Sequence, residues 1–407
     1  MAEIRPFAGI RYGALDLSRV LAPPYDVISD AYRAELCARD PHNIVRVILP
    51  RTQDDAGYDE AGETYRRWLR EGVLQPDPEP ALYVLEQSFA AGGRSLRRFG
   101  LLARFRAEDA ARRIILPHEH TRAAAKEDRW RLLNATKANF SPIFLMFPDP
   151  TAAFTPLVLD VMGHPPVAQF SDDGDVGHRM WRVRDPGLVA RFRNLLGSVP
   201  AYIADGHHRH ATAIRHRDAV GPDGAWTLGY FSPIEAPGLA VLPYHRLLSE
   251  GPSLEEAESR LASRFQLAPM PGAAAAAAVV AASHAAYAFA LAWPEGEALV
   301  AEGEAEAESL LSPVAPGCLR VLDTYFLHHA VLGPLLGVPE AAVSYVHSRG
   351  EAEEALLAAT CRIAVLMRAT PVRQIVDVAD AGESMPAKST FFHPKLPSGL
   401  VIHPLVA

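Results

Sequence analysis

Cysteine is scarce in this sequence. Its three cysteines, Cys37, Cys318 and Cys361, are spread over 407 residues, and none belongs to a Cys-X-X-Cys pair. Because the cysteines are few and odd in number, they exclude a disulfide framework and a cysteine zinc knuckle. They fit a reducing compartment. Residues 1–9 carry charges and lack the apolar run of a signal peptide. We therefore expect a cytoplasmic protein.

A membrane-spanning segment and an excess of positive charge are also missing. The only stretch of bilayer length, residues 271–293, is mostly alanine and contains His284, whereas a central span is normally built from larger apolar side chains. It predicts an alanine-rich helix followed by a strand at 287–291, and no membrane partner. The formal net charge of −8 argues against a nucleic-acid partner, which would require a broadly basic surface.

Apolar residues are plentiful enough for a large core. They make up 49% of the chain, and the length predicts two or three domains. No repeat of 20–50 residues is present, which excludes a solenoid. Gly251-Pro252-Ser253 interrupts the pattern, and Ser253 with Glu256 forms a capping box that starts a helix. We place the domain boundary there, with a phosphate-binding domain at 1–250 and a C-terminal α/β domain at 251–407.

Short apolar runs and helical periodicities alternate along the chain, which predicts the α/β class with mixed sheets. Strands are expected at 44–49, 82–86, 99–105, 143–147, 180–183, 201–204, 228–231, 239–242, 343–347, 363–367 and 400–402. Helices are expected at 58–70, 128–138, 186–196, 211–217, 319–336, 351–358 and 372–381.

The most informative motif is Asp205-Gly206-His207-His208-Arg209-His210. A buried strand ends there, a glycine permits a tight turn, and a helix begins. The unpaired N–H groups and the positive dipole end of that helix favour an anion. Arg209 adds a guanidinium suited to phosphate, and the imidazoles of His207 and His208 can donate to phosphate oxygens.

Other interpretations of this motif stay open. Asp205 could hold Mg²⁺ on a nucleotide or simply cap the helix, and the histidines could lie on a solvent-exposed surface. His207 and His210 are three residues apart and could share a zinc ion, although no His-Glu-X-X-His pattern accompanies them.

Two carboxylates are candidates for a general base. Asp26 follows Pro23-Pro24, which hold an extended and rigid approach, but it could equally be a turn aspartate. Glu119 lies in a polar cluster with His118, directly after the apolar residues 114–116. That cluster marks either a site at the end of a strand or a solvated loop.

Further phosphate ligands are expected in two later segments. His245 and Arg246 follow the strand at 239–242, although Arg246 could be an ordinary surface arginine. The second segment resembles the end of a phosphate-binding P-loop but lacks the upstream glycine pattern, so a P-loop is rejected. Its lysines and hydroxyls could still contact phosphate, or the loop could merely close the second domain; they are Lys388, Ser389, Thr390 and Lys395.

Several separated motifs together resemble one family, the domain of unknown function 1015 family of bacterial and archaeal proteins. The likeness runs nearly end to end. The segments that carry it are residues 5–7, 23–27, 117–121, 139–143, 205–209 and 386–400. The family name implies membership and no activity.

The strand, Asp-Gly-His-His-Arg and helix are also similar to the phosphate-binding turn of the ParB/sulfiredoxin superfamily, which includes free-serine kinases. That likeness implies a ParB/sulfiredoxin-like nucleotide-binding core with insertions, in which residues 206–209 bind phosphate. His207 stands where sulfiredoxins carry cysteine, so sulfinic acid reduction is not expected. The arginine pair of ParB proteins is absent too, and serine-kinase-like chemistry departs least from this sequence.

The sequence therefore predicts a small-molecule phosphotransferase that uses ATP or ADP with Mg²⁺ to phosphorylate a hydroxy metabolite, with free L-serine as the leading acceptor. Asp26 or Glu119 would accept the hydroxyl proton, and Asp205 would hold the metal. A phosphatase acting on phosphoserine or a similar monoester remains an alternative. So does a ParB-like binding protein that senses nucleotide or associates with DNA. A homodimer is compatible with the sequence.

Overall fold

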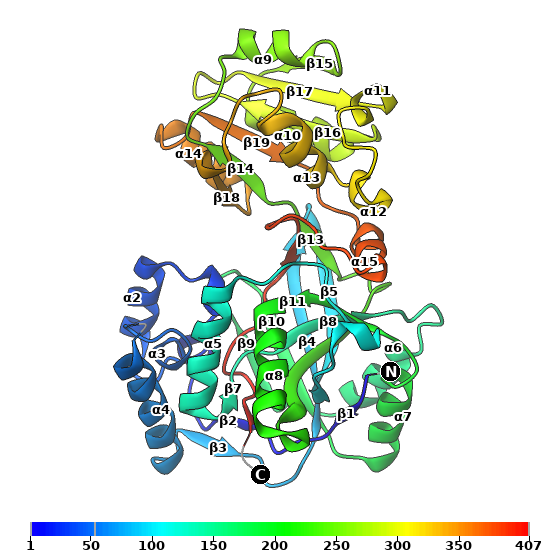
Figure 1. Cartoon of the computed structure of the whole chain (residues 1–407). Coiled ribbons are helices and arrows are strands. Elements are labelled where there is room, and N and C mark those ends of the chain that lie inside the picture. Colours follow the sequence, from blue (N-terminus) through cyan, green and yellow to red (C-terminus); the bar gives the residue numbers. More distant parts are fainter. Residues whose placement is uncertain (1, 53, 406–407) are drawn as a thin grey trace. The chain divides into compact units, whose positions relative to one another are not determined.

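A computed structural model describes residues 2–52 and 54–405 of the chain. The chain forms two compact units (Figure 1): unit 1 comprises Met1–Pro117, Thr121–Ala240 and Pro394–Ala407, and unit 2 comprises His118–His120 and Val241–His393. The main segment of unit 2 thus begins before the expected boundary at 250, because strand β14 (His245–Leu248) already belongs to the sheet of unit 2. The capping box at Ser253 marks the start of a helix and not the start of a domain.

Unit 1 is built on a nine-stranded mixed sheet in which strand β1 (Ile4–Arg5) pairs with β5. The other strands follow the order β6 (Ile115–Leu116), β11 (Ala201–Asp205), β8 (Ile143–Phe147), β12 (Trp226–Pro233), β5 (Arg94–Arg106), β4 (Leu82–Ala91), β10 (Gly177–Val183) and β9 (Ala168–Ser171). β11 runs parallel to β6 and β12 runs parallel to β8, while the remaining pairs are antiparallel. The predicted α/β class with a mixed sheet is confirmed.

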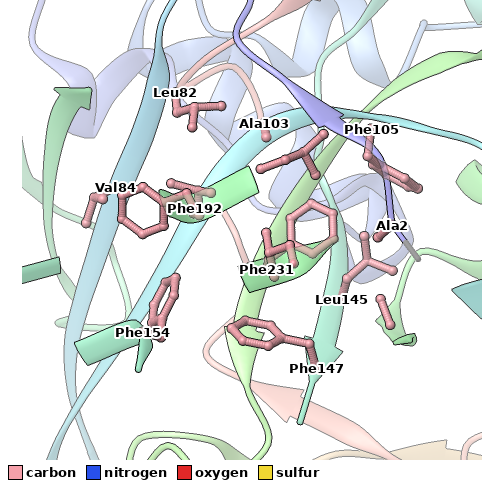
Figure 2. Close-up of a cluster of buried hydrophobic side chains, with 14 of the residues drawn as sticks. Ala2, Leu82, Val84, Ala103, Phe105, Leu145, Phe147, Phe154, Phe192 and Phe231 are labelled. Carbon is pink, nitrogen blue, oxygen red and sulfur yellow. The ribbon is translucent and has the colours of Figure 1, made fainter. Parts of the chain in front are cut away.

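Large apolar side chains from strands and helices form the main core of unit 1 (Figure 2). Helices α6 (Phe154–Met162) and α7 (Pro186–Leu196) contribute Phe154 and Phe192, whose rings meet edge to face with centroids 5.7 Å apart. Phe147 of β8 packs on Phe154 at 5.4 Å. Aromatic pairs of this geometry stabilise a core beyond the area they bury.

A second group of helices supports the segment that follows β11. Helix α8 (His207–Val220) packs against β8 and β12, and it lies beside α5 (Ala123–Thr136), which contacts α4 (Asp55–Arg70) (Figure 1). The smaller elements of unit 1 are α1 (Leu17–Val20), α2 (Asp30–Arg39), the two-stranded pairs β2 (Ile10–Tyr12) with β3 (Leu74–Pro76) and β7 (Ala138–Asn139) with β21 (His403–Pro404), and the 3₁₀ turns η1 (Tyr25–Val27), η2 (Ala110–Arg112) and η3 (Pro222–Ala225).

The strand expected at 44–49 is wrong, because these residues form helix α3 (Val45–Ile48). The side-chain oxygen of Asn43 accepts a hydrogen bond from the N–H of Val45 at 2.9 Å, which favours a helical turn. Val45, Val47 and Ile48 are all buried. A short, fully buried apolar run has no periodicity that distinguishes a strand from a helix.

Unit 2 is built on an antiparallel sheet covered on both faces. Its strand order is β15 (Gln266–Met270), β17 (Ala298–Gly303), β16 (Tyr287–Ala292), β19 (Ile363–Met367), β14 and β18 (Val343–Val346). Helix α9 (Leu254–Leu261) contributes to one apolar core, while α10 (Ala273–Ala282) and α14 (Arg349–Leu357) contribute to the other. The alanine-rich helix, the strand after it and the capping box at Ser253 are therefore confirmed.

The helix expected at 319–336 is not continuous. It is divided into α12 (Gly317–Arg320), α13 (Asp323–Phe326) and a π-helical segment, η4 (Leu327–Leu332).

The strand expected at 400–402, which belongs to unit 1, is reduced to a single β-bridge between Ile402 and Ile10. The remaining elements of unit 2 are α11 (Ala305–Glu308), η5 (Glu340–Ala342), α15 (Val372–Ala381), and β20 (Phe391–His393), which pairs with β13 (Ala240–Leu242). Over the described residues, no helix combines the length and apolar character needed to cross a membrane.

Candidate functional site

The turn between β11 and α8 has the local structure that the sequence predicts. β11 ends at Asp205, Gly206 forms the turn, and α8 begins at His207. The pairing of β11 with β8 shifts register between Ile203 and Asp205, as in a β-bulge. Bulges redirect the side chains that follow them, so the strand end itself helps to orient Asp205.

Gly206 is required at this turn for two reasons. Its φ of 99° lies in the left-handed region, which side chains other than glycine rarely adopt. A Cβ atom at Gly206 would also lie 3.0 Å from Cζ of Arg209. The Arg209 guanidinium is thus folded back against the turn, and it would have to shift to make room for a Cβ.

Asp205 is held by two cations from distant parts of unit 1. One carboxylate oxygen accepts from Arg209, one helical turn further on, and the other accepts from the Nζ of Lys395. Burial acts to raise the pKa of Asp205, but the charges of Lys395 and Arg209 outweigh it and hold the pKa below its usual value. Asp205 is therefore a carboxylate at neutral pH, and it organises the basic side chains around the turn.

A third cation, Arg98, completes this cluster and was not anticipated from the sequence. Arg98 is fully buried, donates to the side-chain oxygen of Gln87 and to the carbonyl of Pro394, and contributes to the charge environment of Asp205. Its guanidinium lies over the ring of Phe144, 4.6 Å from the centroid. The one available signal was a charged residue inside the strand 94–106, at a position directly paired with Gln87 of β4.

The surroundings of the turn suit an anion. The N-cap residue of α8 is Gly206, which has no side chain that could cap the helix, and the leading N–H groups of a helix have no partner within the helix. Arg98, Arg209 and Lys395 supply three positive charges against the single charge of Asp205. The cluster is positively charged, and it lies at the positive end of the α8 dipole.

The three histidines of the motif have different surroundings. His207 is buried at the start of α8, and the Nε2 atom of His208 accepts a hydrogen bond from the N–H of Arg122 at 3.0 Å. Burial lowers the pKa of His208, partly offset by the charge of Asp26. His210 is buried parallel to the ring of Phe105, and burial lowers its pKa to about 4.

Asp26 belongs to the same unit as the turn. It lies in η1, the 3₁₀ turn that follows Pro24, and it is exposed to solvent. The preceding residue, Tyr25, lies under the guanidinium of Arg129 at 3.8 Å from the ring centroid. Burial raises the pKa of Tyr25 to about 12, so this ring remains a neutral phenol that anchors the loop. Asp26 is thus an accessible carboxylate whose charge acts on His208.

His118 and Glu119 belong to unit 2, where they contact the segment after α15. The carbonyl of His118 accepts a hydrogen bond from the N–H of Met385 at 2.8 Å. The backbone of Glu119 forms an isolated parallel β-bridge with Met385. The Nε2 atom of His118 lies 3.3 Å from the hydroxyl oxygen of Thr390. Ser389 is buried and donates to the carbonyl of Pro386 at 2.6 Å. The structure thus brings together two of the segments that the sequence singled out.

His245, Arg246 and Lys388 also meet within unit 2. Arg246 is fully buried, and its guanidinium donates to the carbonyl oxygens of Tyr244 and Lys388. Burial lowers the pKa of Arg246 to about 10 and that of His245 to about 4. Nδ1 of His245 accepts from the N–H of Met367 at 3.2 Å. In this arrangement His245 and Arg246 support the backbone of the sheet and of the loop at Lys388.

The described side chains around the turn do not form a metal site. Among residues 2–52 and 54–405, no three His, Cys, Asp or Glu side chains are grouped so that they could hold one. Both oxygens of Asp205 already accept from cationic side chains. The residues around the turn therefore do not fit a metal held by Asp205, and His207 and His210 do not form part of a zinc cluster in the described chain.

Comparison with known sequences identifies the family. Residues 4–325 match the family described as "Protein of unknown function (DUF1015)", and the chain belongs to it. The expected membership is confirmed. A comparison with curated proteins gives no match.

Some solved structures share a distant likeness with this chain. A free serine kinase in complex with AMP is 14% identical, with a TM-score of 0.34, over 70% of this chain and 89% of its own. A conserved hypothetical protein from Pyrococcus furiosus is also 14% identical, with a TM-score of 0.34, over 70% of this chain and 92% of its own. SbnI from Staphylococcus aureus, with a C-terminal truncation, is 10% identical, with a TM-score of 0.35, over 72% of this chain and 84% of its own.

Proposed function

We propose that this protein is a nucleotide-dependent phosphotransferase that phosphorylates a small hydroxy metabolite. The observation that carries the proposal is the turn at Gly206, where a left-handed glycine opens α8 next to Asp205 and its cluster of Arg98, Arg209 and Lys395. Helix N-termini with adjacent guanidinium and ammonium groups are typical phosphate sites. Phosphoryl transfer depends mainly on positioning and on neutralising charge, which this cluster supplies.

The phosphates of the nucleotide would accept from the N–H groups at the start of α8. Arg209 and Lys395 would share their donors between Asp205 and the phosphate oxygens, since each cation has more N–H groups than one carboxylate oxygen uses. His207 and His208 lie at the same helix start and would add donors. Asp205 would act by holding both cations in place.

Asp26 is our candidate for the general base. It is exposed, it lies on a loop set by Pro23-Pro24, and its charge acts on His208 in the first turn of α8. The carboxylate would take the hydroxyl proton of the acceptor while the acceptor oxygen bonds to the terminal phosphorus and the bond to the leaving nucleotide breaks. Glu119 belongs to unit 2 and is the alternative base.

The acceptor and the donor follow from the likeness of the turn to the superfamily that includes free-serine kinases. We propose free L-serine as the first acceptor to test, and ATP or ADP as the donor. Mg²⁺ is expected to accompany the nucleotide, because this ion is commonly bound through substrate phosphates and retained water. We assign no side chain of the protein as a ligand of this Mg²⁺ ion.

The test follows ³¹P NMR spectra of the full chain with ATP or ADP, Mg²⁺, and a panel of hydroxy amino acids and sugars. A new phosphomonoester signal that needs both nucleotide and acceptor is the expected result. Steady release of phosphate from phosphoserine without nucleotide would instead establish the phosphatase. Nucleotide binding without turnover on any acceptor would leave a binding protein that senses nucleotide.

A further inference from the structure

Unit 2 contains a cavity that the phosphotransferase proposal does not use. Its volume is about 590 Å³, within the roughly 300–1,000 Å³ that small-molecule sites occupy. Its walls come from residues 325–333, from residues 338–345 shortly after them, and from two more distant parts of the chain, His120 and residues 384–387. A space of this size can accommodate a small ligand.

One helical face forms the first wall. Tyr325, His328, His329, Leu332 and Gly333 recur at the spacing of one side of a helix, and all five line the cavity. This stretch contains the π-helical turn η4, and π-helical turns are frequent at functional sites. The rings of Tyr325 and His329 lie against each other with centroids 4.1 Å apart. This wall therefore places several aromatic rings along the cavity.

Tyr345 of β18 forms part of the second wall. Its ring is nearly parallel to that of His328, with centroids 6.3 Å apart and an interplanar angle of 23°. The Nε2 atom of His328 is buried and has no hydrogen-bond partner within the described chain. Less than 1 Å² of this nitrogen is accessible, so His328 borders the cavity with its ring and not with Nε2.

The charge behind this wall is positive. The guanidinium of Arg246 lies over the ring of Tyr345, 5.4 Å from the centroid. Among the residues that the structure describes, no carboxylate forms an ion pair with Arg246, whose guanidinium donates to carbonyl oxygens. Its charge also acts on His328. Glu340, which borders the cavity, is exposed, so solvent screens its opposite charge.

We propose that this cavity binds a planar aromatic anion, with its ring against the Tyr and His side chains and its negative charge directed toward the field of Arg246. Ring surfaces favour a flat partner, because aromatic groups stack in offset or edge-to-face arrangements. A buried cation without an ionic partner favours an anion over a neutral ligand of the same shape. The site lies entirely within unit 2 and does not depend on the proposed phosphotransferase function.

Gly333 offers a way to block the cavity without disturbing the fold. It has helical backbone angles, with φ of −74° and ψ of −59°, and a Cβ there would meet no atom within 4 Å. Gly333→Leu therefore adds a side chain at a cavity-lining position without strain. Gly317→Leu is the matched control, because Gly317 also has open space and lies outside this cavity. Ala387→Phe, in another wall of the cavity, is a second blocking variant.

The experiment measures the binding of the probe indole-3-carboxylate to the full chain by ligand-observed saturation-transfer NMR. We expect indole-3-carboxylate to bind the native protein and Gly317→Leu. For both blocking variants we expect its affinity to fall by about tenfold or more. Indole-3-carboxamide, which lacks the charge, and cyclohexanecarboxylate, which lacks the aromatic ring, should also bind at least about tenfold more weakly. Circular dichroism establishes that each variant is folded.

Three outcomes would overturn the inference. The first is no detectable binding of indole-3-carboxylate to the native protein. The second is equal binding by a folded blocking variant, which would place the probe elsewhere. The third is equal or tighter binding of the uncharged or the non-aromatic probe, which would remove the argument from Arg246 or from the ring surfaces.

Discussion

Lys395 donates to the carboxylate of Asp205 across a sequence separation of 190 residues. The pair links the last segment of the chain to the strand end that precedes α8. Both side chains are largely buried, with about 14% and 15% of their surface exposed. The opposite oxygen of Asp205 accepts from Arg209, so the carboxylate aligns two cations beside the helix start. The charge on this cluster is the basis of the first prediction.

Removing either cation should weaken the binding of phosphate ligands. For Arg209→Ala and Lys395→Met we expect a loss of about 1.5–3 kcal/mol in binding free energy, the scale of a hydrogen bond to a charged group. Isothermal titration with the nucleotide that the native protein binds measures this loss. Arg191→Ala is the control, because Arg191 of α7 forms an exposed pair with Asp160. Unchanged affinity in both cluster variants would contradict the assignment of this turn.

Gly206→Ala should damage both the turn and the stability of the protein. A left-handed backbone costs about 1–2 kcal/mol for a residue with a Cβ, and here the added atom also meets the Arg209 guanidinium at 3.0 Å. Gly382→Ala is the matched control, since Gly382 has φ of 73° and open space around it. We expect urea denaturation to show a loss in both variants, and a loss of phosphate binding in Gly206→Ala alone.

Acid should destabilise the protein through His210. Burial lowers its pKa to about 4, from about 6.5 in an unfolded chain. The unfolded chain therefore binds more protons between these two values, and stability falls as pH falls from 6.5 toward 4. Near pH 5 the loss from this residue is about 2 kcal/mol.

The measurement is urea unfolding of the native protein and of His210→Phe at pH 7 and pH 5. The variant keeps a ring beside Phe105 and has no group that takes up a proton, so its stability should fall less between the two pH values. His164→Gln, at an exposed position, should behave as the native protein does. The same pH dependence in all three proteins would exclude His210 as the cause.

Asp26→Asn should separate catalysis from nucleotide binding. It keeps the size of the side chain and removes the base, so kcat should fall by about 10²–10⁴-fold, the usual contribution of a general base. Nucleotide affinity should change little. Asp30→Asn, at the exposed start of α2, is the control. If kcat is unchanged in Asp26→Asn but falls in Glu119→Gln, the base is Glu119.

Much of the local structure was predictable, because its signals lie close together in the sequence. Helix α7, strand β8 and helix α15 have the expected bounds, and each shows clear periodicity or ends at proline or glycine. The turn at Gly206 was predictable for the same reason. The segment at 45–48 was not, because a short buried apolar run fits either a strand or a helix.

The cluster around the turn was only partly predictable. Arg209 and Lys395 were expected as phosphate ligands, but their shared partner Asp205 was assigned to a metal. Arg98 and Gln87 were missed, because their importance depends on the pairing of β4 with β5 and on the return of residue 394 to unit 1. The cavity beside η4 was missed as well, since His120 and residues 384–387 are far in the sequence from the walls that residues 325–345 form.

The sequence by itself determined the family, the α/β class and the glycine turn that opens α8, because short-range patterns and fixed φ preferences act within a few residues. Only the tertiary structure decided which cations surround Asp205 and which rings border the cavity in unit 2. Those neighbours come from segments as much as 296 residues apart, the separation between Arg98 and Pro394. Their meeting depends on strand order and on long-range packing, which local patterns do not specify.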